Sequence, residues 1–339
     1  MINRIQEDIM QNWGTSNSDQ PLVSIKCMTY NHEKYIAQAL EGFLMQETNF
    51  PFEILVHDDA SNDKTADVIR AYEEKFPKII KPIYETENQW SKGNRAHHKQ
   101  IDAMIKGKYI AVCEGDDFWT DPNKLQMQVD FLESHPDYSM CFHGAAIKYD
   151  DNLYTQAECE SIQDKDYSAD ELLNHWTVPT ASIVMRRECV DYPIKNRSAI
   201  VYGDYFAVFS CLALGKVRGF SKSMSTYRVN GNSITYNPEY RIKTILKMPE
   251  NWECFKENFP FVPKKSINRT LAFHYWQRAK IQPNLKLSFQ DRKKAFSLSP
   301  IFSFMLIFRP FYLAVLDLLS KHFNTTKLSS CIKKMISHV

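Results

Sequence analysis

An apolar run that leads directly into three acids lies in the first half of the chain: Gly107-Lys-Tyr-Ile-Ala-Val-Cys-Glu-Gly-Asp-Asp-Phe-Trp119. The run at 108–113 is short and is bounded by a glycine and by the acids, which predicts a buried strand. A helix is predicted over 123–134, with Asp121 as its N-cap and Pro122 in its first position. A strand followed by a helix is therefore the local pattern at this point.

The same pattern occurs three times before Gly107. Strands are predicted over 22–28, 52–57 and 79–84, and helices over 33–46, 64–76 and 97–106. Strands separated by helices of this length indicate right-handed crossovers and a mostly parallel sheet. The predicted fold class is therefore α/β, with helices flanking the sheet. Further along, apolar stretches recur at 180–185, 202–214 and 224–229, and helices are predicted over 248–259 and 266–281.

The overall composition is that of a globular protein. The 339 residues include 42 Lys+Arg and 40 Asp+Glu, with 44% apolar and 24% charged residues, which excludes a disordered or collagen-like chain. The eight cysteines are scattered, with no pair at metal-ligand spacing, so a zinc ribbon and a disulfide-framed small protein are excluded as well. The polar segment at 1–20 lacks the apolar stretch of a secretory signal. A cytoplasmic location is expected.

The C-terminal tail differs from the rest of the chain. Residues 292–339 carry eight Lys/Arg and one acid, Asp317, and they include the apolar run 301–319. A membrane span needs about 20 apolar residues, and Arg309-Pro310 interrupts this run near its middle. Attachment to an anionic membrane surface is therefore favoured, which would place the protein peripherally on the inner face of the cell membrane. A membrane span and soluble packing remain alternatives.

Polar groups follow three of the predicted strands. The segment Thr29-Tyr30-Asn31-His32 follows the first, Asp58-Asp59-Ala60-Ser61-Asn62-Asp63 the second, and Glu114-Gly115-Asp116-Asp117 the fourth. Lys92-Gly93-Asn94-Arg95 adds positive charge in the loop after the third. In α/β sheets of this kind, ligands bind outside the carboxyl ends of the strands. The sequence therefore predicts a ligand site at this edge of the sheet.

The acids after the fourth strand are candidates for metal binding. Glu114, Asp116 and Asp117 repel one another unless a cation or protons neutralise them. Mg²⁺ and Mn²⁺ take oxygen ligands, commonly one or two carboxylates together with the phosphates of a substrate. A metal and diphosphate site is one interpretation, and a solvated acidic turn before the next helix is the other.

Other side chains at the same edge suit a nucleotide. A carboxylate at Asp58 or Asp59 could accept a hydrogen bond from a base or a ribose hydroxyl, or could serve only its own turn. Thr29 and Tyr30 could offer a hydroxyl and an aromatic face to a nucleoside, although Tyr30 could equally pack in the core. Arg95 could pair with a diphosphate through its planar fork, or be a solvated loop arginine.

Asp204 is a further candidate, in Tyr202-Gly203-Asp204-Tyr205-Phe206 at the start of an apolar helix. An aspartate there is usually a helix cap. If it is partly buried beside a sugar hydroxyl, its pKa would rise and it could act as a general base.

Several function classes lack their motifs. The chain has no Walker or G-x-G-x-x-G loop and no G-x-S-x-G elbow, which argues against ATP or NAD phosphate cradles and against serine hydrolases. The basic, aromatic tail carries no nucleic-acid motif, so no nucleic-acid partner is expected.

Three segments together resemble the family 2 (GT-A) glycosyltransferases. They are Val23-Ser-Ile-Lys-Cys-Met-Thr-Tyr-Asn31, Glu53-Ile-Leu-Val-His-Asp-Asp-Ala-Ser-Asn-Asp-Lys-Thr65 and the stretch from Gly107 to Trp119, continued by Asp121-Pro-Asn-Lys-Leu125 and His135-Pro-Asp137. Residues 177–235 match more loosely, through Gly203-Asp204 and Tyr227-Arg228-Val-Asn-Gly-Asn-Ser233. The resemblance implies a Rossmann-like GT-A domain at 21–240, with a donor half at 21–143 and an acceptor half at 144–240. A helical C-terminal region would follow at 241–339.

The resemblance also implies roles for individual residues. A nucleotide-sugar, most simply a UDP-sugar, would be held by the loops of Thr29, Tyr30 and Asp59, with Asp58, Arg95 and Arg228 nearby. Glu114-Gly115-Asp116 takes the place of the D-x-D motif, with a glutamate as its first acid, and Asp116 or Asp117 would hold Mg²⁺ or Mn²⁺. Asp204 matches the general base. Asn230 stands where many relatives have a histidine.

The implied reaction is a single displacement that inverts the anomeric carbon, with a glycan or lipid-linked acceptor in cell-surface polysaccharide assembly. Two alternatives remain. One is a catalytically silent module that binds sugar nucleotides or glycans. The other is a nucleotidyltransferase, which would normally have a glycine- and Lys/Arg-rich loop where this chain has Met28-Thr29-Tyr30-Asn31.

Overall fold

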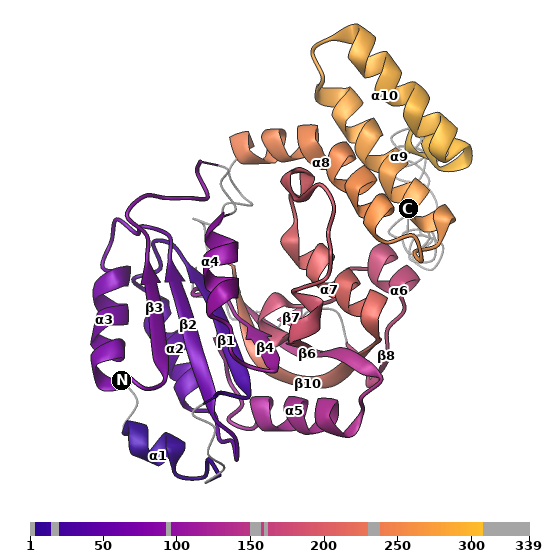
Figure 1. Cartoon of the computed structure of the whole chain (residues 1–339). Helices are drawn as coiled ribbons and strands as arrows, with labels where there is room; N and C mark the ends of the chain where they lie inside the picture. The colour runs from indigo at the N-terminus through magenta and orange to yellow at the C-terminus, as the bar shows by residue number, and fades with distance from the viewer. Residues whose placement is uncertain are drawn as a thin grey trace, which may run out of the picture. The chain divides into compact units, whose positions relative to one another are not determined.

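The computed structural model describes residues 4–14, 20–92, 96–149, 157–158, 162–229 and 238–307 (Figure 1). The chain divides into two compact units. The first comprises Met1–Pro193 and Gly203–Ser233, and the second comprises Ile194–Tyr202 and Ile234–Val339.

Four parallel strands form the first half of the sheet in unit 1. They are β1 (Val23–Thr29), β2 (Phe52–Asp58), β3 (Ile80–Tyr84) and β4 (Tyr109–Val112), in the order β3-β2-β1-β4. In the middle of this group, Val23 of β1 is in register with Phe52 on one side and with Tyr109 on the other. The predicted α/β fold is confirmed, and each of these strands lies within a residue or two of its predicted position.

The helices between these strands cover both faces of the sheet. Helix α2 (Ile36–Leu44) connects β1 to β2, and helix α3 (Thr65–Lys75) connects β2 to β3. Both connections move in the same direction across the sheet. The helix α4 (Ala96–Met104) belongs to the connection that returns from β3 to β4 beyond β1. Because such connections are right-handed, reversing the direction moves the helix to the opposite face. Figure 1 shows α4 in front of the strands and α2 behind them.

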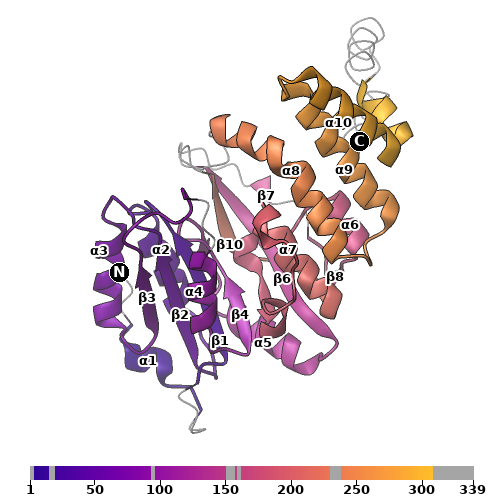
Figure 2. The ribbon, with the colours of Figure 1, turned by 45° about the horizontal axis from the view of Figure 1, so that its top comes forward.

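The second half of the sheet is mixed rather than mostly parallel. The short strand β9 (Val184–Arg186) runs antiparallel to both β4 and β6 (Tyr138–Tyr149). Strand β6 lies parallel to β10 (Lys216–Val229), as Figure 2 shows, and β5 (Phe118–Trp119) pairs antiparallel with β10. The remaining elements of unit 1 are α1 (Gln6–Met10), α5 (Lys124–Ser134), β7 (Ala157–Glu158), β8 (Lys165–Asp166), α6 (Ala169–Asn174), η1 (Thr180–Ser182), η2 (Arg187–Cys189) and α7 (Gly203–Leu214).

Two long strands differ from what the sequence pattern predicts. Strand β6 falls where no strand is predicted, because Ser139, His143 and Gly144 interrupt its buried stretch and leave no apolar run longer than three residues. Strand β10 begins at Lys216, eight residues before the apolar stretch at 224–229, because its exposed residues 221–223 lie at register shifts that interrupt the apolar pattern.

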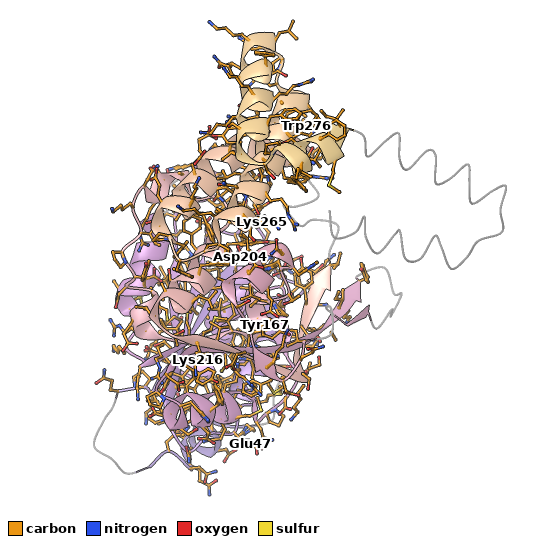
Figure 3. The ribbon with its side chains drawn as sticks, turned by 90° about the vertical axis from the view of Figure 1, so that its right-hand side faces the viewer. Glu47, Tyr167, Asp204, Lys216, Lys265 and Trp276 are labelled. Carbon is orange, nitrogen blue, oxygen red and sulfur yellow. The ribbon has the colours of Figure 1, made fainter. Side chains whose placement is uncertain are left out.

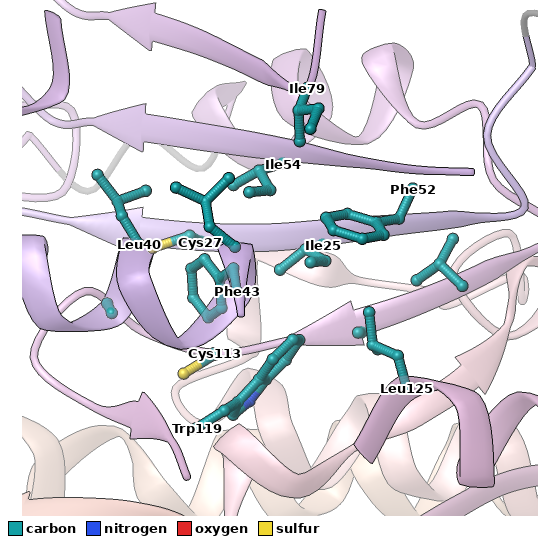
Figure 4. Close-up of a cluster of buried hydrophobic side chains, with 14 of the residues drawn as sticks. Ile25, Cys27, Leu40, Phe43, Phe52, Ile54, Ile79, Cys113, Trp119 and Leu125 are labelled. Atoms are coloured by element: carbon teal, nitrogen blue, oxygen red, sulfur yellow. The ribbon is translucent and has the colours of Figure 1, made fainter. Parts of the chain in front are cut away.

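A buried apolar cluster supports the carboxyl edge of the sheet (Figure 4). Ile25 and Cys27 of β1 and Ile54 of β2 meet Phe43 of α2, whose ring centre lies 4.7 Å from that of Trp119. The Trp119 indole donates a hydrogen bond of 2.7 Å to the carbonyl of Ala181. Burying a side chain of this size is worth about 1.5–3 kcal/mol. The cluster therefore fixes Trp119, and with it the acid turn that precedes it.

Helices α3 and α5 begin one residue later than predicted, so their N-cap positions fall on Lys64 and on Asn123 rather than on the predicted Asp121, and neither N-cap side chain bonds the helix. Helix α3 starts at Thr65, whose N–H donates to Asp63 at 2.9 Å. Helix α5 starts at Lys124, and Asp121 accepts the N–H of Asn123 at 2.8 Å in the turn before it.

Unit 2 consists mainly of three helices, α8 (Pro238–Asn258), α9 (Lys264–Ile281) and α10 (Leu285–Leu298), with η3 (Arg197–Ala199). Arg278 of α9 forms ion pairs with Asp291 of α10 at 2.8 Å and with Glu250 of α8 at 2.5 Å. None of the helices in the described part of the chain combines the length and the hydropathy needed to cross a bilayer. Most of the apolar run 301–319 lies outside the described residues.

Candidate active site

The acid turn follows β4 and is bonded to the end of β1. The N–H of Gly115 donates to the carbonyl of Met28 at 2.9 Å, and the N–H of Asp117 donates to the carbonyl of Glu114 at 3.1 Å. A Cβ atom on Gly115 would lie 2.7 Å from Oγ1 of Thr29. The turn thus requires glycine at this position because the two loops approach so closely.

Asp117 faces the protein interior. It is 2% exposed, and its Oδ1 accepts the backbone N–H of Arg228 at 2.8 Å. Burial raises its pKa well above the ordinary value, and the charges of Glu114 and Asp116 raise it further. Asp116, by contrast, keeps 23% of its side chain exposed. Of the two acids predicted as metal ligands, Asp116 is therefore the one presented to a ligand.

Arg228 connects the acid turn to α2. Its Nε donates to the carbonyl of Asp116 and its Nη2 donates to Oε1 of Gln38, both at 2.8 Å. The guanidinium also lies 4.7 Å from the ring centre of Tyr35 and 5.2 Å from that of Phe118. The predicted ligand Arg228 thus shapes the site through contacts within the protein.

His32 joins the site, although the sequence pattern does not single it out. Its Nε2 lies 3.8 Å from Oδ2 of Asp116. Its Nδ1 and Oγ1 of Thr29 are buried, have no hydrogen-bond partner among the described residues, and lie within 3.1 Å of the Cβ position of Gly115. Buried polar atoms are normally paired, so these two atoms are suited to a bound ligand or water. The only signal in the sequence is the position of His32 in the loop after the first strand.

Asp204 reaches the same site from α7. Burial raises the pKa of Glu114 to about 8, and the charges of Asp116 and Asp204 add to this rise. Asp204, labelled in Figure 3, accepts the N–H of Tyr205 at 2.9 Å, and burial raises its own pKa. Asp204 is therefore near enough to the acid turn after β4 for its charge to raise the pKa of Glu114.

The acids after β2 organise two loops. Asp58 accepts the hydroxyl of Ser61, which is the turn chemistry considered as its alternative role. Asp59 accepts the backbone N–H groups of Gln89 at 2.7 Å and Trp90 at 3.0 Å, and so anchors the loop after β3. Tyr30 is 38% exposed, and its hydroxyl accepts a hydrogen bond of 3.4 Å from the side-chain amide of Asn62. The predicted ligand Arg95 lies outside the described residues, as does Asn230.

The donor set suits a hard divalent cation bound together with a substrate. Within the described residues, no group of three or more His, Cys, Asp or Glu side chains forms a metal site by itself. Asp116 offers carboxylate oxygens beside two further acids whose mutual repulsion a cation would relieve. Mg²⁺ is commonly bound by one or two carboxylates plus substrate phosphates and water, and this arrangement fits that pattern.

Residues 24–192 match the family model described as glycosyl transferase family 2. An uncharacterised protein of Mycobacterium tuberculosis is 34% identical over 215 residues, which cover 63% of this chain and only 61% of that relative. The putative teichuronic acid biosynthesis glycosyltransferase TuaG of Bacillus subtilis is 26% identical over 67% of this chain and 84% of its own. The Escherichia coli enzyme WfaP, a UDP-Glc:alpha-D-GlcNAc-diphosphoundecaprenol beta-1,3-glucosyltransferase, is 25% identical over 64% and 80% respectively.

Solved structures share the fold at low sequence identity. TarS of Staphylococcus aureus (residues 1–349), in complex with UDP-GlcNAc, superposes with a TM-score of 0.53 at 16% identity over 84% of this chain and 91% of its own. The mannosyltransferase PcManGT of Pyrobaculum calidifontis, in complex with GDP-Man and Mn²⁺, gives 0.54 at 16% identity over 96% and 87%. These likenesses confirm a GT-A-like fold.

Proposed function

Because the chain belongs to glycosyl transferase family 2 through residues 24–192, we propose that it transfers a sugar from a nucleotide-sugar, most simply a UDP-sugar, to a hydroxyl of a glycan or lipid-linked acceptor. The observation that supports this most directly is the effect of the charge of Asp204 on the pKa of Glu114 in the acid turn. It is consistent with a carboxylate near the residues suited to a diphosphate. Transfer to a hydroxyl requires both groups together.

The donor would lie against the loops after β1, β2 and β4. Asp116, with the unpaired polar atoms of Thr29 and His32 near it, faces the diphosphate. Asp59 and Tyr30 would border the nucleoside, together with the loop after β3 that Asp59 anchors. A Mg²⁺ or Mn²⁺ ion held by Asp116 and the donor phosphates would neutralise the charge of the departing nucleoside diphosphate. The complexes of TarS with UDP-GlcNAc and of PcManGT with GDP-Man and Mn²⁺ support this assignment.

Asp204 is the proposed general base. Its burial raises its pKa, which makes the carboxylate a better proton acceptor than a solvated aspartate. It would take the proton of the acceptor hydroxyl as that oxygen attacks the anomeric carbon from the side opposite the leaving group. A single displacement of this kind inverts the anomeric configuration.

The cellular role follows from the relatives. TuaG acts in teichuronic acid biosynthesis by its name, and WfaP glucosylates a lipid diphosphate sugar, so we place this chain in cell-surface polysaccharide assembly. Such acceptors are reached at the inner face of the cell membrane. Leu285, Phe289 and Ile301 are 84%, 70% and 79% exposed, and Lys286 and Lys293 are exposed beside them. This part of unit 2 is suited to an anionic lipid surface.

The proposal is tested with a panel of UDP- and GDP-sugars. Release of nucleoside diphosphate from each sugar is measured with Mn²⁺, with Mg²⁺ and with EDTA. We expect release from one donor, dependent on the metal and lost in Asp116→Asn. Binding of a nucleotide-sugar without any release would instead identify a silent binding module. Release of pyrophosphate from a nucleoside triphosphate would identify a nucleotidyltransferase.

A further inference from the structure

An aromatic pair includes Tyr205, the residue that follows Asp204 in the chain. Trp176, in the segment between α6 and η1, stacks on Tyr205 of α7 with ring centres 3.9 Å apart and an interplanar angle of 24°. Tyr205 is the residue after Asp204, and its N–H donates to that carboxylate. The pair is therefore fixed with respect to the proposed general base.

The stack differs from the aromatic side chains of the core. Trp119 is 2% exposed and its indole N–H is bonded, as expected for a core residue. Trp176 and Tyr205 both remain partly exposed, so they leave apolar area in water. Packing alone gives no reason for two flat side chains at the surface of a polar site. A rigid aromatic surface that loses little conformational entropy on binding is typical of ligand recognition.

A polar group next to the stack lacks a partner. Oγ1 of Thr177, the residue after Trp176, is shielded from solvent and has no hydrogen-bond partner within the described part of the chain. A hydroxyl left in this state costs about 1–3 kcal/mol unless a ligand or water bonds it. An aromatic face, an unpaired hydroxyl and a carboxylate therefore occur within two short segments, 176–177 and 204–205.

We propose that Trp176 and Tyr205 form the subsite for the acceptor and that this subsite binds a pyranose ring. The C–H groups on one face of a pyranose are weakly positive and apolar, and they match the negative face of an aromatic ring. The hydroxyl groups at the edge of the sugar can bond the carboxylate of Asp204. An acceptor that presents a phosphate here is disfavoured, because the carboxylate of Asp204 would repel it.

This inference rests on the proposed function and specifies its acceptor as a saccharide. It is tested with purified full-length Trp176→Ala and Trp176→Phe. The donor found in the nucleotide-sugar panel is supplied with methyl glycosides of glucose, galactose, mannose and N-acetylglucosamine, and with an undecyl N-acetylglucosaminyl diphosphate. Donor hydrolysis without acceptor and binding of the nucleoside diphosphate are measured in parallel, since both report a folded donor site.

We expect Trp176→Ala to raise the acceptor KM at least tenfold while donor KM, donor hydrolysis and nucleotide binding stay unchanged. Trp176→Phe keeps an aromatic face and should recover most of the loss. An acceptor KM that is equal in wild type and Trp176→Ala would overturn the proposal. The proposal would also be overturned if the wild-type enzyme hydrolysed its donor and none of the saccharides accelerated the release of nucleoside diphosphate. A wild-type chain that neither hydrolyses nor transfers any donor would refute the proposed function itself.

Discussion

The backbone N–H of Arg228 donates a hydrogen bond of 2.8 Å to Oδ1 of Asp117, which lies 111 residues earlier in the chain. The side chain of the same arginine bonds the carbonyl of Asp116 and the amide of Gln38. The end of β10 thus fixes the orientation of the acid turn, in which Asp117 is buried and Asp116 stays partly exposed.

Replacing Arg228 by methionine should loosen this turn. The change removes two hydrogen bonds of a buried cation, and we expect the free energy of unfolding to fall by about 2–4 kcal/mol. Binding of UDP with Mn²⁺ should weaken at least tenfold, because Asp116 loses its anchor. Urea unfolding and calorimetry measure the two effects. Arg70→Met removes an exposed ion pair and serves as control, with an expected change below about 1 kcal/mol. Unchanged UDP binding in Arg228→Met would contradict the positioning role.

Asp116 and Asp117 should differ when each is changed to asparagine. Asp116→Asn removes the exposed carboxylate, and we expect the Mn²⁺-dependent part of UDP binding to disappear. Asp117→Asn should retain most of that binding, because the oxygen of the new side-chain amide could still accept the N–H of Arg228. Isothermal titration calorimetry with and without Mn²⁺ separates the two variants. Equal losses in both would show that Asp117 is also presented to the ligand.

Asp204→Asn should lower kcat by about 10²–10⁴-fold, the usual contribution of a general base, with nucleotide binding retained. Because burial raises the pKa of Asp204, the acid limb of the wild-type kcat/KM profile should lie above the pH expected for a solvated aspartate. Activity falls below that pKa since the protonated carboxyl cannot accept a proton. Asp67→Asn, at an exposed position, is the control. A variant at position 204 with full turnover removes Asp204 from the mechanism.

Lys124 should make stability depend on pH. Its ammonium is fully buried 4.0 Å from the centre of the Trp119 ring, and burial lowers its pKa from 10.5 to about 7. Between these pH values the unfolded chain binds the proton and the folded chain does not. The free energy of unfolding should therefore rise with pH from about 7 to 10, by roughly 3–4 kcal/mol from this group, and gain nothing from it below about pH 6.

Lys124→Met removes this titration and its desolvation cost. At about pH 6.5 we expect urea unfolding to give the variant a higher free energy of unfolding than wild type. The difference between the two free energies should become smaller as the pH rises to about 9.5. The exposed Lys78→Met is the matched control and should follow wild type at each pH. A gap for Lys124→Met that is constant with pH would show that the buried amine does not titrate in this range.

The proposed membrane attachment should depend on the exposed apolar side chains of unit 2. Serine at Phe289, Ile301 and Phe304 together should reduce sedimentation with anionic liposomes at least tenfold, because each loses apolar contact with the lipid. Phe261→Ser changes a residue that is 44% exposed outside this segment and should bind as wild type does. Binding that survives the triple substitution, or that is equal on neutral liposomes, would refute attachment through this surface.

Much of the fold follows from local patterns in the sequence. The strands β1 to β4 and the helices between them occur where the apolar spacing predicts them, because buried strands and amphipathic helices have distinct periods. Strand β6 could not be found in this way, since Ser139, His143 and Gly144 divide its apolar residues into runs too short to indicate a strand. The edge that carries the site also follows from the sequence, because parallel strands end together and their loops must meet there.

The sequence by itself determined the fold class and the identity of the acids at the sheet edge. Only the tertiary structure decided which way each side chain faces. Asp117 is turned inward by Arg228, His32 is brought to Asp116, and Trp176 is stacked on Tyr205. The physical reason is the range of the interactions. Periodicity records which positions are buried within one element, whereas these contacts join segments that are far apart in the chain and meet only when the sheet is complete.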